Sequence, residues 1–178
     1  MPFTPFHMGA GLAIKAVAGR HFSLLTFGVA QVVMDLQPLV GMLRGDADLH
    51  GISHTYAGAA VLGALVAVAA PVACNPILRR YNQEAKAMRL PWLASEDRIS
   101  RPAAAVGAFV GTFSHVLLDS LMHADMQPLW PAAAANALLF KVDVDAVYNG
   151  CLYAGVLGLA VWLVRKYRKA GQESVLPR

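Results

Sequence analysis

The sequence predicts an all-α protein embedded in a membrane as a helical bundle, with four spanning helices plus a short N-terminal helix. Three observations point to this fold class. Hydrophobic residues make up 57% of the 178 residues and charged residues only 15%, which is too few charges for a water-exposed surface. Four apolar stretches approach or exceed the roughly 20 residues that a helix needs to cross a bilayer. Lys and Arg gather at the ends of these stretches, as they do in membrane proteins.

The elements follow in order along the chain. Residues 7–18 are apolar, but at about 1.5 Å per residue a helix of this length is too short to span a bilayer. In the first spanning stretch Asp35 and Gln37 interrupt the apolar run, the third contains His115 and Asp119, and the fourth has no charged residue. The four spanning helices are expected over about residues 21–43, 52–78, 102–122 and 146–164.

Most of the charge lies outside the spanning helices. Residues 79–101 hold six of the 15 Lys and Arg residues and are expected to form a basic cytoplasmic loop, while residues 171–178 form a polar tail. With the N-terminus outside, 13 of the 15 basic residues fall on the cytoplasmic side. By the positive-inside rule, the C-terminus is therefore expected in the cytoplasm. Residues 1–170 are expected to form one membrane-embedded domain.

Histidines and aspartates gather near the predicted outer ends of the helices. His50 and His54 are four residues apart, as are His115 and Asp119, and His123 lies four residues further on. Side chains four residues apart project from one face of a helix, so each pair can bind one ion. The glycine within the first pair weakens a continuous helix there, and a loop leading into a helix is an equal alternative. The candidate ligands are His7, Asp35, His50, His54, His115, Asp119 and His123.

Two of these carboxylates, Asp35 and Asp119, lie inside apolar helices. An ionised side chain near the centre of a membrane helix costs about 2.5–3.5 kcal/mol, so it usually faces the protein interior with a partner. Neither carboxylate has a Lys or Arg near it in the sequence. Histidines and a divalent cation satisfy both, and a set of imidazole and carboxylate ligands suits zinc, manganese or iron. We therefore expect Asp35, His54, His115 and Asp119 to converge.

Four motifs carry a resemblance that covers most of the chain. They are Pro-Phe-Thr-Pro-Phe-His-Met-Gly at the start, Asp35 at the end of an apolar helix, His-Gly-Ile-Ser-His-Thr, and Ser-His-Val-Leu-Leu-Asp-Ser. In these motifs the chain resembles the YdjM-type inner-membrane metal-dependent hydrolases, also described as LexA-binding. That family is similar to the zinc-dependent phospholipase C and zinc nuclease superfamily of all-helical enzymes with a multi-zinc cluster.

The resemblance implies a set of ligands in a fixed order along the chain. The order is an early His, an Asp, a His, and then His-x-x-x-Asp with further histidines. The N-terminal Trp of the phospholipases and a later His-x-x-x-Glu are absent here, so one or two ions are expected rather than three. The matching positions are His7, Asp35, His54, His115, Asp119 and His123.

The resemblance also implies a function. It is that of a membrane-bound hydrolase of a phosphoester, with a lipid as substrate, acting at the outer face of a bacterial inner membrane. Zinc is the expected cofactor, with manganese or iron as alternatives. Asp35 or Asp125 is expected to orient or deprotonate the attacking water.

Two other classes of function stay open. One is a transporter that moves a metal ion or protons along the same residues, and the other is a small membrane regulator with a structural metal site. Membrane lipid is the expected partner. Nucleic acid is not expected, because the basic residues lie at helix ends rather than along one polar face.

Overall fold

The computed structural model describes residues 6–175, which form five α-helices and three short 3-10 helices without any strand. The predicted all-α fold is therefore confirmed, and four of the helices are long and apolar enough to cross a membrane. Only the first α-helix is too short, as the sequence indicates. The α-helices are α1 (His7–Ala18), α2 (Leu24–Arg44), α3 (Tyr56–Ala87), α4 (Arg101–Met122) and α5 (Val144–Val175), and the 3-10 helices are η1 (Gly19–His21), η2 (Ile52–His54) and η3 (Pro91–Leu93).

Two helices extend further than the sequence predicts. Helix α3 continues to Ala87, so the first part of the basic segment 79–101 is helical and only the part after it is a loop. Helix α5 continues through residues 171–175 of the predicted polar tail. Both extensions consist mostly of residues with good helix propensity, and Arg80 and Glu84 add an ion pair at 2.9 Å across one turn. Polar residues thus continue both helices beyond the apolar stretches from which the helices were predicted.

Local capping residues set where the spanning helices start. The hydroxyl groups of Ser23, Thr55 and Ser100 accept hydrogen bonds from backbone N–H groups in the first turns of α2, α3 and α4. At the other end of α2, Gly45 adopts φ 77°, the left-handed conformation that favours glycine at a helix terminus. These signals place both ends of the loop between α2 and α3.

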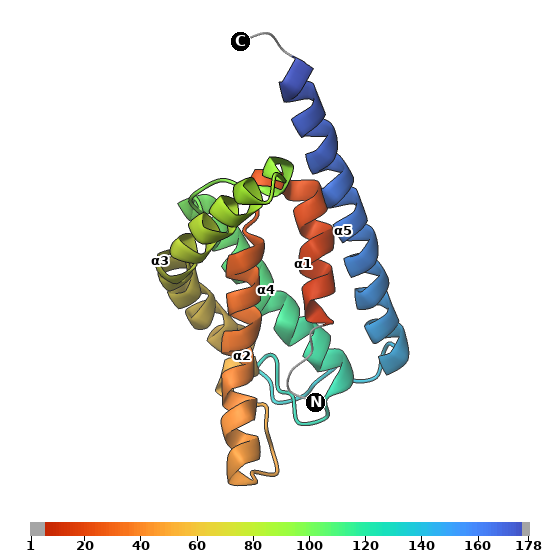
Figure 1. The fold of residues 1–178 in the computed structure, drawn as a ribbon. Coiled ribbons are helices and arrows are strands. Elements are labelled where there is room, and N and C mark those ends of the chain that lie inside the picture. Colours follow the sequence, from red (N-terminus) through yellow and green to blue (C-terminus); the bar gives the residue numbers. More distant parts are fainter. Residues whose placement is uncertain (1–5, 176–178) are drawn as a thin grey trace.

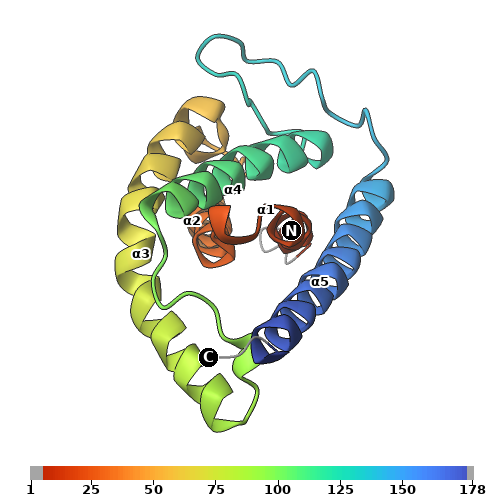
Figure 2. The same ribbon diagram turned by 90° about the horizontal axis from the view of Figure 1, so that it is seen from above.

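The helices divide the molecule into two ends. Helices α2, α3 and α4 pack together, and α1 lies between α2 and α5 (Figures 1 and 2). The start of α1, the loop between α2 and α3, the end of α4 and the start of α5 lie at one end, and η1 and η3 lie at the other (Figure 1). The first of these ends carries the candidate ligands.

Helix α1 is held against α5 by close contact between small residues. A Cβ atom on Gly9 would lie 1.9 Å from the carbonyl oxygen of Cys151, and one on Gly158 would lie 2.5 Å from the backbone nitrogen of Ala13. Small residues allow this approach between the two backbones, and no larger side chain fits. Because His7 is the first residue of α1, the same contact positions one candidate ligand.

We expect Gly9→Val to destabilise the protein by about 1–3 kcal/mol, the usual cost of overpacking a tight contact. The change would also displace His7 and so lower the amount of bound metal. Gly150→Val is the matched control, because a Cβ atom at Gly150 meets nothing within 4 Å. Thermal unfolding followed by circular dichroism in detergent measures the difference. Equal midpoints for the two variants would contradict the close packing of α1 on α5.

Candidate metal centre

The structure brings the predicted ligands together from separate parts of the chain. His7 begins α1, Asp35 lies on α2, and His115 and Asp119 lie one turn apart on α4. Sets of three ligand atoms, all within 4.8 Å of one another, connect these residues with the histidines of the loop between α2 and α3. The predicted convergence of Asp35, His54, His115 and Asp119 is therefore confirmed, while their binding of metal stays a prediction.

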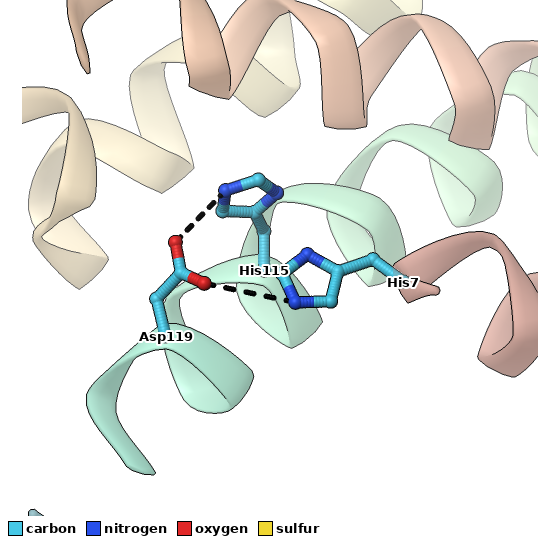
Figure 3. Close-up of side chains that lie close together, drawn as sticks. All are labelled: His7, His115 and Asp119. Atoms are coloured by element: carbon cyan, nitrogen blue, oxygen red, sulfur yellow. Dashed lines mark ion pairs between the residues drawn. The ribbon is translucent and has the colours of Figure 1, made fainter. Parts of the chain in front are cut away.

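Asp119 lies at the centre of the group and is 3% exposed. Its Oδ2 atom is 3.1 Å from Nε2 of His115 and 3.5 Å from Nε2 of His54. Its Oδ1 atom is 3.6 Å from Nε2 of His7, so the two carboxylate oxygens face different histidines (Figure 3). His50 and His123 lie further out, each with Nε2 4.0 Å from this carboxylate. Asp119 can therefore bridge two groups of ligands.

The atoms around Nε2 of His115 have the spacing of neighbouring ligands to one ion. This atom is 3.4 Å from Oδ1 of Asp35 and 3.3 Å from Nε2 of His54. Two ligands about 2.0–2.1 Å from a zinc ion, at the tetrahedral angle, lie about 3.3 Å apart. The distances from His115 to Asp35, His54 and Asp119 thus match edges of a coordination polyhedron.

Hydrogen bonds show that Nδ1 carries a proton in several of these histidines. Nδ1 of His50 donates to the Asp125 carboxylate at 2.8 Å, which can only accept. Nδ1 of His54 is 2.9 Å from the Ser53 hydroxyl, whose hydrogen is donated to Gln37, so this Nδ1 also donates. When such a ring is neutral, its Nε2 presents a lone pair to the centre.

His115 follows the same pattern through a residue that was not predicted. Its Nδ1 donates to Oε1 of Gln31 at 2.7 Å, and the Gln31 amide nitrogen donates to the carbonyl oxygen of Gly111. Gln31 is 6% exposed and lies one turn before Asp35 on α2. This buried amide in an apolar stretch, four residues from a candidate ligand, is the signal that would have identified it.

With the rings of His54 and His115 neutral, their Nε2 atoms and the carboxylates present acceptors to the centre. Nε2 of His54 and Nε2 of His115 face each other at 3.3 Å, beside the Asp35 and Asp119 carboxylates. Both ring nitrogens of His7 are buried without a hydrogen-bond partner, and burial lowers the pKa of His7 to about 4, so the ring is neutral at pH 7. Lone pairs and carboxylates that converge in this way fit a divalent cation, which would satisfy all of them.

His50 and His54 do not lie on one continuous helix, which was one of the two arrangements expected for this pair. His50 lies in a loop and His54 ends η2, so the pair does not share the face of a continuous helix. Gly51 has a non-helical conformation, with φ −96° and ψ −145°, so no helix continues from His50 to His54. Helix α3 begins only after Thr55. The loop leading into a helix is therefore the correct alternative, and the turn, rather than helical spacing, brings the two rings to 4.8 Å between their centroids.

Asp125 is held at the edge of the cluster by three groups of one loop. Its carboxylate accepts from Nδ1 of His50 and from the backbone N–H groups of Leu49 and His50. These bonds and the nearby His50 ring lower the pKa of Asp125 to about 2 despite its partial burial. A carboxylate held in this way orients His50, while the role expected for Asp125 in orienting or deprotonating a water stays a prediction.

The other polar residues lie at the edge of the centre or away from it. His21 is exposed in η1 at the opposite end of the bundle, as its isolation in the sequence suggests. His123 is half-buried, its ring lies 4.4 Å from that of His50 between centroids, and burial lowers its pKa. The remaining aspartates of this end form an exposed rim, at Asp46, Asp48, Asp143 and Asp145.

A cavity of about 570 Å³ opens beside the cluster. His50 and Asp125 line it on the side of the candidate ligands, and among the described residues no Lys or Arg lines it. Ligands commonly bind in concave, partly apolar sites of this size that carry a few polar groups. Its apolar wall comes from Ile52, Met126, Trp130 and Leu139.

Comparison with known proteins identifies the family. Residues 6–176 match the family model described as YdjM inner membrane protein. No match was found among curated proteins or among solved structures. The match agrees with the four helices that are able to span a membrane, and both support a multi-pass protein of the inner membrane. Because the match covers nearly the whole sequence, the chain belongs to the family of YdjM inner membrane proteins.

Proposed function

We propose that the protein is a membrane-bound, metal-dependent hydrolase that acts on a phosphoester of a lipid. The observation that carries the proposal is the convergence of imidazole lone pairs and carboxylates beside an open cavity. Four residues, Asp35, His54, His115 and Asp119, would hold one ion. His7 would hold a second ion through the other oxygen of Asp119, which His123 also faces.

The chain's own residues support this chemistry by holding the ligands in place. A bound divalent metal supplies polarisation of a phosphoryl oxygen and a water whose pKa is lowered to about 7. Gln31, Ser53 and Asp125 each fix the tautomer and direction of one histidine. Asp35, which has one oxygen at the centre, and Asp125 are the candidates to orient or deprotonate this water.

The cavity fits a substrate with a polar group and an apolar part. Because no Lys or Arg lines it, the charge of a phosphate bound there has to be balanced at the metal centre. Its apolar wall suits the glyceryl and upper acyl region of a phospholipid, which lies at the level of helix ends in a membrane.

The location of the cluster supports a hydrolase over a transporter. A transporter needs polar residues along a route to both faces of the membrane. Here the buried side chains next to the cluster towards η1 and η3 are uncharged in the described part of the chain, and include the fully buried Phe27, Ala30 and Ala108. Metal or proton flux into sealed vesicles containing the purified protein is the result that the transporter alternative expects.

Removal and return of the metal tests the proposed activity. Purified protein is stripped with a chelator, and hydrolysis of a panel of phosphoesters, including phosphatidylglycerol, is measured before and after zinc or manganese is added. We expect activity to disappear with the metal and to return with it. Cleavage by metal-free protein at a rate that added metal does not change would overturn the proposal.

Asp125→Asn is expected to lower turnover about 10–100-fold while most of the metal stays bound, because Asp125 contacts a histidine rather than the centre itself. Metal analysis and hydrolysis are measured on the same preparation. Asp143→Asn is the matched control, since Asp143 is exposed at the same end of the molecule. Complete loss of metal from Asp125→Asn would show instead that this carboxylate is a ligand.

We expect the C-terminus to lie in the cytoplasm and the metal centre towards the outer face. The basic residues of the 79–101 segment and of α5 after Val164 lie at the end with η3, opposite to the candidate ligands (Figure 1). A reporter enzyme fused after Arg178, active only in the cytoplasm, checks this orientation. A periplasmic signal would place the metal centre on the cytoplasmic side.

A further inference from the structure

A second cavity lies at the end of the bundle opposite to the candidate metal centre. It has a volume of about 710 Å³ and is bounded by the end of α1, by η1 and η3, and by the C-terminal half of α5. Trp92 and Trp162 form part of its wall, and Glu96 is the one acidic residue that lines it in the described chain. The basic residues that line it are Lys15, Arg20, Arg165, Lys166 and Lys169.

Neutral groups, rather than carboxylates, hold two of these cations in place. Nζ of Lys15 donates to the carbonyl oxygens of Gly19 and Phe22, both at 2.8 Å. Nζ of Lys166 donates to two carbonyl oxygens and one hydroxyl group in the η3 segment, and lies 4.7 Å above the Trp162 ring. The fold therefore builds positive charge into the wall of this cavity and fixes its position.

The positive charge exceeds the negative charge in the lining of this cavity, with five basic residues and Glu96. Among the side chains of residues 6–172, no carboxylate lies within 4.0 Å of a charged nitrogen of Lys15, Arg20, Arg165 or Lys166. Arg165 donates to the carbonyl oxygen of Ala16, which leaves the rest of its guanidinium group for another partner. This excess of cations over carboxylates in one cavity favours an anion, and phosphate groups are well matched to Arg.

An apolar cavity of about 270 Å³ adjoins the basic one, and the two share five lining residues, among them Arg20 and Trp162. It lies between the starts of α2 and α4 and the far end of the apolar part of α3. A charged compartment that continues into an apolar one matches an amphiphile rather than a small soluble anion. The apolar lining includes Phe22, Leu24, Leu25, Ile77, Leu78 and Ile99.

We propose that these joined cavities bind an anionic phospholipid, with its phosphate in the basic cavity and part of an acyl chain in the apolar one. Both lie where helices end, at the level at which Trp residues and lipid headgroups meet in a membrane. Basic pockets between membrane helices on the cytoplasmic side are suited to anionic headgroups. The site is separate from the metal centre and does not depend on the proposed hydrolase activity.

Tryptophan fluorescence reports on this site directly. The chain has three Trp residues, and Trp130 lies at the cavity beside the metal centre, so Trp130→Phe leaves Trp92 and Trp162 as the reporters. The variant is purified in a nonionic detergent without phosphate and titrated separately with dioleoylphosphatidylglycerol, dioleoylphosphatidylcholine and inorganic phosphate. We expect a saturable change with phosphatidylglycerol at a concentration at least about fivefold below that needed for phosphatidylcholine.

Matched variants assign the effect to the cavity. Arg20→Gln with Arg165→Gln is expected to weaken phosphatidylglycerol binding at least about fivefold, and Arg20→Lys with Arg165→Lys to retain most of it. Arg79→Gln with Arg168→Gln removes two exposed charges from the same end but outside the cavity, and is expected to bind as before. Arg20→Gln alone keeps the comparison valid if the double variant fails to fold, since Arg20 is exposed.

Two results would overturn the proposal. Equal responses to both lipids, unchanged by Arg20→Gln, would show that the cavity has no preference for an anionic headgroup. A response to inorganic phosphate as strong as that to phosphatidylglycerol would assign the site to a soluble phosphate compound instead of a lipid. A response to phosphatidylglycerol that exceeds both controls, and that the charge-removing variants weaken, supports the lipid site.

Discussion

Asp119→Asn is expected to lower metal affinity and hydrolysis by more than about 100-fold, which is the upper range for residues that only contact a ligand. The carboxylate faces His54 and His115 with one oxygen and His7 with the other, so its loss affects both groups of candidate ligands at once. Metal content after dialysis against a fixed zinc concentration, and hydrolysis by the same sample, measure the effect. Asn has nearly the same shape as Asp, so the fold is perturbed less than by Asp119→Ala.

The same variant distinguishes a metal centre from a buried ion pair. If His115 carried two protons and paired with Asp35 and Asp119, the wild-type protein would contain no metal. Breaking such a buried pair would then destabilise the protein by about 3–5 kcal/mol. Asp143→Asn, which changes an exposed carboxylate at the same end, is expected to leave metal content and stability unchanged. A wild-type protein without metal and a strongly destabilised Asp119→Asn would contradict the proposal.

The amount of bound metal and the rate of hydrolysis are both expected to be highest near pH 7.5 and to fall together between about pH 6 and pH 4. Imidazole binds metal only when it is neutral, and an unperturbed histidine has a pKa near 6.5. Burial lowers the pKa of His7 to about 4 and also lowers that of His54, so these rings resist protonation in the folded protein. The loss therefore extends to lower pH than an exposed histidine would give.

The free energy of unfolding of the metal-free protein should also decrease as the pH falls. Above pH 6.5, His7 is neutral in both the folded and the unfolded chain, and its titration contributes no pH dependence. As pH falls from 6.5 to about 4, the unfolded chain takes up a proton that the folded chain does not. The free energy of unfolding then decreases by on the order of 3 kcal/mol through His7.

Equilibrium dialysis at each pH, followed by metal analysis and a hydrolysis assay, checks the expectation for the metal. His21→Ala is the matched control, because His21 is exposed at the opposite end and should not shift the curve. Metal retained in full at pH 4 would exclude imidazole ligands. Activity lost while the metal stays bound would assign the pH dependence to another group.

The sequence alone predicts the membrane bundle well, because the signals are local. Length and apolar composition determine whether a helix can span a bilayer, and they place all four spanning helices and the short α1. The pairing of His115 with Asp119 is equally local, since residues four apart on a helix always share a face. Polar extensions of α3 and α5 were missed because an apolar stretch marks the membrane-spanning part of a helix and not its end.

Which residues face His115 and Asp119 was decided by the tertiary structure. Close glycine contacts between α1 and α5 bring His7 to Asp119, and the turn after Gly51 brings His54 to His115. Neither contact follows from the separation of these residues in the sequence. The roles of Gln31 and Asp125 also emerge only when helices and loops meet, because a hydrogen bond to Nδ1 of a histidine depends on direction as well as distance. The sequence determined which residues were available as ligands, while packing decided which atoms face one another.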